Sequence, residues 1–160
     1  MQPFYDGWAA DQQRLLDSLR PLTLEQMQLR PAPGEYAIWQ LASNMAGGRY
    51  YWFCRMLGED DKGARRLFQE GDWEDRPDNP KSAAELEIAF LKTWDAVSAA
   101  MDRWTLEDLQ TPVTATDFWG REQTITPAWV LYRVIAHEAH HGAEISSILR
   151  VHGLPTLLNY

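Results

Sequence analysis

The sequence predicts an all-α fold, a four-helix bundle built by a single domain of 160 residues. Four stretches repeat apolar residues every three or four positions, which is the period of an amphipathic helix. Capping signals begin several of these stretches, and glycine or proline follows them. One long polar connection separates the second stretch from the third, as a crossover does in many bundles. A hydrophobic content of 45% is enough for such a core.

The first long helix is predicted over residues 3–19, and Pro21 ends it. Its apolar positions are Phe4, Trp8, Leu15, Leu16 and Leu19. Thr23 and Gln26 then fit a capping box, in which each side chain caps the backbone of the other residue. We therefore expect a short helix there, which the prolines within residues 31–33 bring to an end.

The second long helix is predicted over residues 35–57, and Gly58 follows as a stop signal. Its apolar face carries Ile38, Leu41, Ala42, Met45, Trp52, Phe53 and Met56. Within it, Gly47 and Gly48 each cost about 1 kcal/mol relative to alanine. Close approach of another helix, or space for a ligand, would compensate for that cost. Residues 58–81 are rich in charge, glycine and proline, which predicts a long surface crossover and not a second domain.

The third long helix begins after Ser82, which forms a second capping box with Glu85. Its apolar side contains Leu86, Phe90, Leu91, Trp94, Val97 and Met101. The following residues 112–126 contain β-branched residues around a Trp-Gly turn signal, so we expect a small hairpin or an irregular lid.

The fourth long helix is predicted from Thr126, its N-cap, through Pro127 to His152, with Gly153 behind it. Eight tryptophans predict a core that contains large rings, some of which line a pocket.

Charge and cysteine content exclude several classes of protein. With 15 Lys+Arg against 23 Asp+Glu, the net charge of −8 has the wrong sign for binding nucleic acid or anionic membranes. The single cysteine, Cys54, can form no intramolecular disulfide. The N-terminal stretch contains early acidic residues and no long apolar run, which argues against a signal peptide or anchor. We therefore expect a cytoplasmic protein with a small-molecule substrate.

The main chemical signal is a histidine cluster on the fourth helix, His137-Glu138-Ala139-His140-His141. At about 100° per residue, His137 and His141 are inward-facing neighbours, whereas His140 points further round the helix. Two imidazoles one turn apart can chelate one divalent metal. The alternative is that the pair only forms hydrogen bonds across the core.

Two other motifs match the same residues formally. The string fits H-E-x-x-H, in which two histidines bind zinc and the glutamate acts as a base. A metalloprotease also needs a distant third ligand and a substrate-binding sheet edge, but only 19 residues follow His141 and no sheet is predicted. Glu138 and His141 also form the Glu-x-x-His unit of di-iron bundles, which requires a second copy that the sequence lacks.

The chain resembles the DinB/YfiT-like superfamily of small four-helix bundles over nearly its full length. The resemblance is carried by Trp129-x-x-Tyr132-x-x-x-x-His137-x-x-His140-His141-Gly142-x-Glu144-Ile145 and by Trp39-Gln40-Leu41-Ala42-Ser43-Asn44-Met45. It implies a homodimer and a divalent metal, commonly nickel or zinc, held by one histidine of the second helix and two of the last. The last-helix pair carries over to His137 and His141.

The third family ligand does not carry over, because Asn44 stands where the family has histidine. An asparagine carbonyl oxygen is a weaker ligand for nickel or zinc than an imidazole nitrogen. Glu144 could complete a two-histidine, one-carboxylate site, or form only a surface salt bridge. Asn44 could likewise only hydrogen-bond one of the histidines. Arg49, beyond Asn44 on the same helix, could bind a carboxylate in the pocket or form a surface salt bridge.

The resemblance implies a metal-dependent thiol transferase, acting with a low-molecular-weight thiol, or a metal-dependent hydrolase. A metal with three protein ligands keeps open positions for water or a thiol. The alternative is a non-catalytic, stress-related bundle whose metal site is degenerate, and Asn44 is the residue that favours it.

Overall fold

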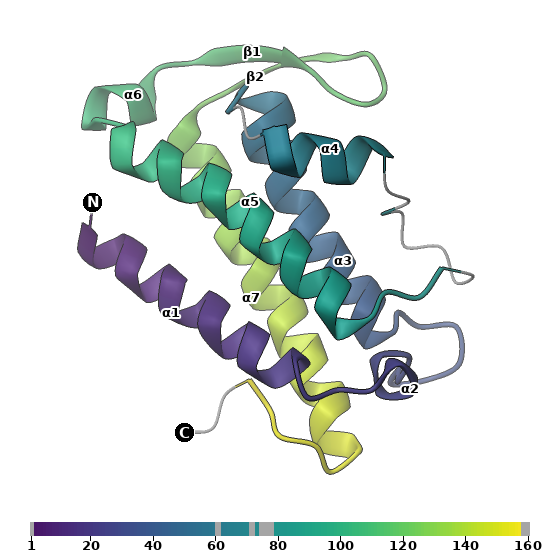
Figure 1. Cartoon of the computed structure of the whole chain (residues 1–160). Coiled ribbons are helices and arrows are strands. Elements are labelled where there is room, and N and C mark those ends of the chain that lie inside the picture. The colour runs from purple at the N-terminus through teal and green to yellow at the C-terminus, as the bar shows by residue number, and fades with distance from the viewer. Residues whose placement is uncertain (1, 60–61, 71–72, 74–78, 158–160) are drawn as a thin grey trace.

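The computed structural model describes residues 2–59, 62–70, 73 and 79–157 of a mostly helical chain. Four long segments run side by side (Figure 1): α1 (Gln2–Leu19), α3 (Ile38–Arg49) continued by η1 (Tyr50–Met56), α5 (Ala83–Arg103) and α7 (Pro127–Val151). The all-α class is confirmed, and the four long helices lie where the sequence predicts them. None of the described helices is both long enough and apolar enough to cross a bilayer.

The predicted capping residues begin three of the helices. The Thr23 hydroxyl accepts from the Gln26 backbone N–H, and the Gln26 side chain accepts from Thr23 in return, at the start of α2 (Leu24–Met27). Ser82 and Glu85 form the same arrangement before α5. Thr126 caps α7, whose first residue is proline. These local signals therefore fix where the long elements begin.

The predicted surface crossover contains a further helix, α4 (Lys62–Glu70). Its Ala64 is fully buried against Cys54 of η1 and Ala96 of α5, so this part of the connection packs on the body of the molecule. The expectation of a purely surface connection is therefore wrong for α4. Residues 60–61, 71–72 and 74–78 of the stretch lie outside the described part of the chain.

The second long helix differs from its prediction at both ends. It begins at Ile38, and its last seven residues form a π-helix, η1. The Leu57 backbone N–H donates to the Trp52 carbonyl, five residues earlier, at 3.1 Å. A π turn contains more residues than an α turn, which changes the angle between successive side chains, yet the predicted apolar residues Phe53 and Met56 are both buried. The spacing of apolar residues alone does not reveal the change from an α-helix to a π-helix.

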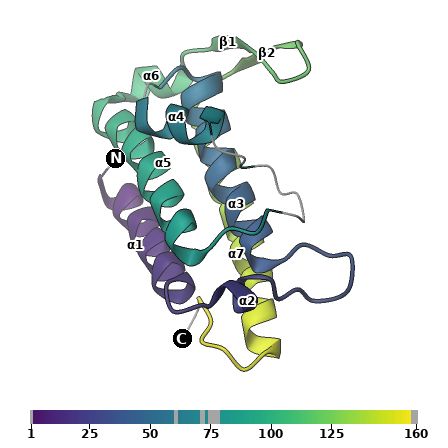
Figure 2. The ribbon, with the colours of Figure 1, turned by 45° about the vertical axis from the view of Figure 1, so that its right-hand side comes forward.

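Residues 112–126 form a hairpin and not an irregular lid. Strands β1 (Val113–Thr116) and β2 (Glu122–Ile125) pair antiparallel, with Val113 opposite Ile125. The buried Asp117 carboxylate accepts backbone N–H groups of Trp119 and Arg121, each at 2.9 Å, which holds the turn closed. The hairpin follows the short helix α6 (Leu106–Gln110) and lies across one end of the long helices, as the turned view confirms (Figure 2).

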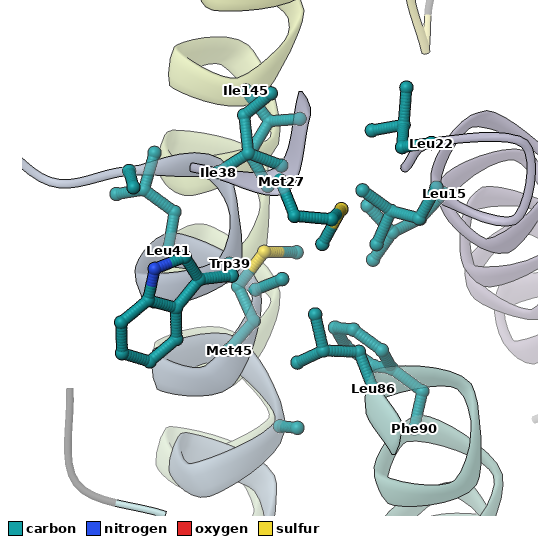
Figure 3. Close-up of a cluster of buried hydrophobic side chains, with 14 of the residues drawn as sticks. Leu15, Leu22, Met27, Ile38, Trp39, Leu41, Met45, Leu86, Phe90 and Ile145 are labelled. Atoms are coloured by element: carbon teal, nitrogen blue, oxygen red, sulfur yellow. The ribbon is translucent and has the colours of Figure 1, made fainter. Parts of the chain in front are cut away.

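The main core is built from the inner faces of α1, α2, α3, α5 and α7 (Figure 3). Its central side chains are Leu15, Met27, Ile38, Trp39, Met45, Leu86, Phe90 and Ile145. The tryptophans divide between interior and surface. Trp8 and Trp39 are buried, whereas Trp119 and Trp129 are exposed, so the expected core of large rings is correct for only part of the set.

Candidate metal centre

The centre lies where α3 approaches α7, two helices that run in opposite directions (Figure 1). A β-carbon on Gly48 would lie 3.2 Å from Cε1 and 3.3 Å from Nδ1 of His137. The missing side chain of Gly48 therefore makes room for the His137 imidazole. This close approach compensates for a glycine inside the helix. At Gly47, the corresponding atom would make an ordinary 3.8 Å contact with Phe68.

His137 and His141 lie side by side on α7. Their Nε2 atoms are 3.1 Å apart, and the two rings meet edge to face at an interplanar angle of 89°. Zinc binds imidazole nitrogen at about 2.0–2.1 Å, so two such nitrogens on a tetrahedral ion lie about 3.3 Å apart. The two Nε2 atoms therefore need little movement to share one divalent ion.

Glu144 lies on the other nitrogen of His141. Its Oε2 atom is 2.6 Å from His141 Nδ1, and the carboxylate is partly exposed. A carboxylate on Nδ1 holds the proton there and leaves Nε2 with a free lone pair, which is how many metal-binding histidines are oriented. In this arrangement Glu144 positions His141, and its role as a metal ligand stays a prediction.

Asn44 lies one turn before Gly48 on α3, and its side chain is exposed. Because α3 and α7 are antiparallel, this position faces the level of His141. Among the described residues, no hydrogen bond joins Asn44 to either histidine. The alternative in which Asn44 hydrogen-bonds one of them is therefore wrong for this conformation.

His140 forms a second possible grouping, to which the sequence assigned no role. One ligand atom from each of His140, His141 and Glu144 lies within 4.8 Å of the others. The His140 side chain is 70% exposed, and its Nε2 atom lies 3.7 Å from Glu144 Oε1. His137 and His141 are less exposed than His140, so their half-buried pair is the better organised of the two.

Burial, with smaller contributions from the neighbouring His141 and Arg133, lowers the pKa of His137 to about 4. The imidazole is therefore neutral at pH 7. A neutral imidazole keeps the lone pair that a metal requires.

The sequence did not foresee the role of Glu138. Its carboxylate is buried and accepts from Nε and Nη2 of Arg49, the latter at 2.8 Å, and from Trp8 Nε1 at 2.9 Å. Arg49 therefore binds a carboxylate of the protein itself, that of Glu138. The alternative prediction, that Arg49 forms a surface salt bridge, is wrong. The glutamate of the formal H-E-x-x-H motif is paired with Arg49 in the core, so it is not available as a general base, which argues against a metalloprotease. The sequence does contain a signal for this pair, because Glu138 is a charged residue in an otherwise apolar sector of the helix.

Comparison with known proteins agrees with this architecture. The family model of the DinB superfamily matches residues 8–145. The fold is similar to the crystal structure of a DinB-like protein from Bacillus cereus, with a TM-score of 0.74, 24% identity, and coverage of 100% of this chain and 97% of that chain. No curated protein matches the sequence. Taken with the helical order, the match over most of the chain establishes that this protein belongs to the DinB superfamily.

Proposed function

We propose that this DinB protein is a four-helix bundle that binds divalent nickel or zinc through Nε2 of His137 and His141. We further propose that it acts as a metal-dependent thiol transferase or hydrolase. The observation that carries the proposal is the 3.1 Å separation of the two Nε2 atoms. Nitrogen ligands suit nickel and zinc, and Asn44 or solvent would complete the shell.

The chain's own residues would contribute orientation and access. Glu144 holds His141 in the tautomer that presents Nε2, burial keeps His137 neutral, and Gly48 leaves space for its ring. Asn44 and His140 are exposed, so a substrate can approach from solvent. When bound, a divalent ion would lower the pKa of water or of an incoming thiol and so supply a nucleophile at neutral pH.

A second candidate is a non-catalytic bundle with a degenerate metal site. It is favoured by Asn44, which replaces the family histidine. In the part of the chain that the structure describes, Asn44 forms no hydrogen bond with His137 or His141. In that case His137 and His141 would serve only as a hydrogen-bonded pair at the edge of the core.

Equilibrium dialysis of Ni²⁺ and Zn²⁺ against purified, tag-free protein separates the two candidates. We expect the wild-type chain to bind either ion, and His137→Ala and His141→Ala to lose binding. His152→Ala is the matched control, because His152 lies at the C-cap of α7 and is exposed. Asn44→His should tighten binding by adding a third imidazole. If the wild-type chain and His152→Ala bind no more ion than the two alanine variants, the degenerate bundle is correct.

A further measurement tests the reaction class. Protein loaded with Co²⁺ in place of zinc changes its visible spectrum when a thiolate sulfur binds the ion. A saturable change on adding glutathione or cysteine supports thiol transfer. The absence of a change, together with hydrolysis of an activated ester that His141→Ala abolishes, supports a hydrolase.

A further inference from the structure

A cavity of about 270 Å³ lies between α1 and α7, and it is separate from the histidine pair. On α7 it is lined by Ile135, Glu138, Ala139, Gly142 and Ala143. At 100° per residue these positions face away from His137, His141 and Glu144. A β-carbon on Gly142 would meet no atom within 4 Å, so small residues on α7 leave this space open.

The floor of the cavity is a buried charged pair. Arg49 and Glu138, both lining residues, bind each other, and Arg49 Nη1 also donates to the side-chain oxygen of Gln12. The guanidinium is surrounded by rings, with its central carbon 5.2 Å from the Trp94 centroid and 5.3 Å from that of Phe90. A buried ion pair stabilises a fold little more than apolar residues of the same size would. Its presence beside an open cavity therefore suggests recognition.

Hydrogen-bonding capacity remains on both partners. A guanidinium has five N–H donors and a carboxylate about four acceptor positions. Glu138 accepts hydrogen bonds from Nε and Nη2 of Arg49 and from Nε1 of Trp8. Among the residues that the structure describes, the Gln12 carboxamide, supplied from α1, is the one partner of Nη1. A ligand that carries a carboxamide could take the place of Gln12, accepting from Arg49 and donating to Glu138.

Charge and shape restrict the ligand further. Arg49 neutralises Glu138, and at the rim Arg14 pairs with Asp11, so the cavity has no net charge to offer an ion. The remaining walls are mainly apolar, formed by Trp8 and by aliphatic side chains such as Leu15, Ile135 and Leu157. Since one water occupies about 30 Å³ in the liquid, the volume suits a molecule of roughly nine non-hydrogen atoms.

We propose that the cavity between α1 and α7 binds a small uncharged molecule with an apolar body and a terminal carboxamide, held by Arg49 and Glu138 in place of Gln12. The site does not depend on the metal centre. Hexanamide is a suitable probe. Hexanoate and hexylamine have the same chain with a negative or a positive end.

The test follows the Trp8 indole N–H by NMR, because this group lines the cavity and donates to Glu138. We expect hexanamide at millimolar concentration to shift the Trp8 signal saturably, and hexanoate and hexylamine to bind at least tenfold more weakly. Gly142→Leu fills the cavity without a backbone clash and should abolish the shift. Gly7→Leu, on an exposed part of α1 where a β-carbon also meets no atom within 4 Å, is the matched control and should retain it.

Three results would overturn the proposal. These are no saturable shift with hexanamide, a shift that persists in Gly142→Leu, or charged probes that bind as tightly as the amide. Gly142→Leu must keep the circular dichroism spectrum of the wild type, and its unfolding midpoint must be at least as high. If it does not fold, Ala143→Leu serves as the filling variant, since Ala143 lines the same cavity.

Discussion

At the scale of single residues, the contact between Glu144 and His141 is the feature most open to test. A carboxylate that orients a metal-binding histidine typically contributes 10–100-fold to metal affinity. We therefore expect Glu144→Ala to weaken Ni²⁺ or Zn²⁺ binding by about 10–100-fold. Glu144→Gln should lose less, because its carbonyl oxygen can still accept from Nδ1. Equal affinities for the three proteins by calorimetric titration would remove Glu144 from the centre.

The depressed pKa of His137 predicts how stability depends on pH in the metal-free protein. Its pKa is about 4 in the folded chain and about 6.5 when unfolded, so below pH 6.5 the unfolded state binds the proton first. Stability should therefore fall as the pH is lowered from about 6.5 to 4. The slope should stay well below the limit of about 1.4 kcal/mol per pH unit, because the ring is only half-buried. Urea unfolding of wild type and His137→Asn checks this, and identical slopes would contradict it.

Sequence reasoning found His137 and His141 because a spacing of four residues places side chains on one helical face. It could not assign Glu144 to Nδ1 of His141, since that depends on the rotamers of both side chains. The predicted role of Asn44 in the centre rests on the resemblance to the family, and it stays a prediction. The exposure of Asn44 depends on how far apart α3 and α7 lie there, which no residue pattern encodes.

At the scale of elements, the Arg49–Glu138 pair joins α3 to α7 one residue beyond Gly48 and His137. Removing one partner of a buried pair costs about 3–5 kcal/mol, because the other charge stays buried without compensation. We expect Arg49→Met to lose this amount in denaturant unfolding, and the double variant Arg49→Met with Glu138→Leu to recover most of it. Arg14→Met, which breaks an exposed pair with Asp11, should change stability by less than about 1 kcal/mol. A loss in the double variant equal to the sum of the single losses would contradict this account.

The adjacent glycines of α3 provide a matched comparison. Gly47→Ala places its new methyl group in ordinary contact with Phe68, so it should stabilise the helix by up to about 1 kcal/mol. Gly48→Ala would press on the His137 ring at 3.2 Å, so it should gain less stability and weaken metal binding. Thermal unfolding and metal titration of both variants measure the two effects. Equal metal affinity in both would show that the close approach at Gly48 does not matter.

The long elements were predictable because their signals are local. Capping boxes at Thr23 and Ser82 and the proline at the start of α7 depend on neighbouring residues only. The π-helical continuation of α3 and the packing of α4 were not predictable, since they follow from contacts with distant elements. The Arg49–Glu138 pair joins residues 89 positions apart, so only a three-dimensional arrangement could reveal it.

At the scale of the whole molecule, superfamily membership and the helical fold are established, and the metal centre is the central proposal. The most direct test is the metal content of the intact chain. It is measured by elemental mass spectrometry on protein purified without an affinity tag. We predict stoichiometric nickel or zinc in the wild type and in His152→Ala, and its loss in His137→Ala and His141→Ala. Wild-type protein that carries no more metal than these two alanine variants would contradict the proposed centre.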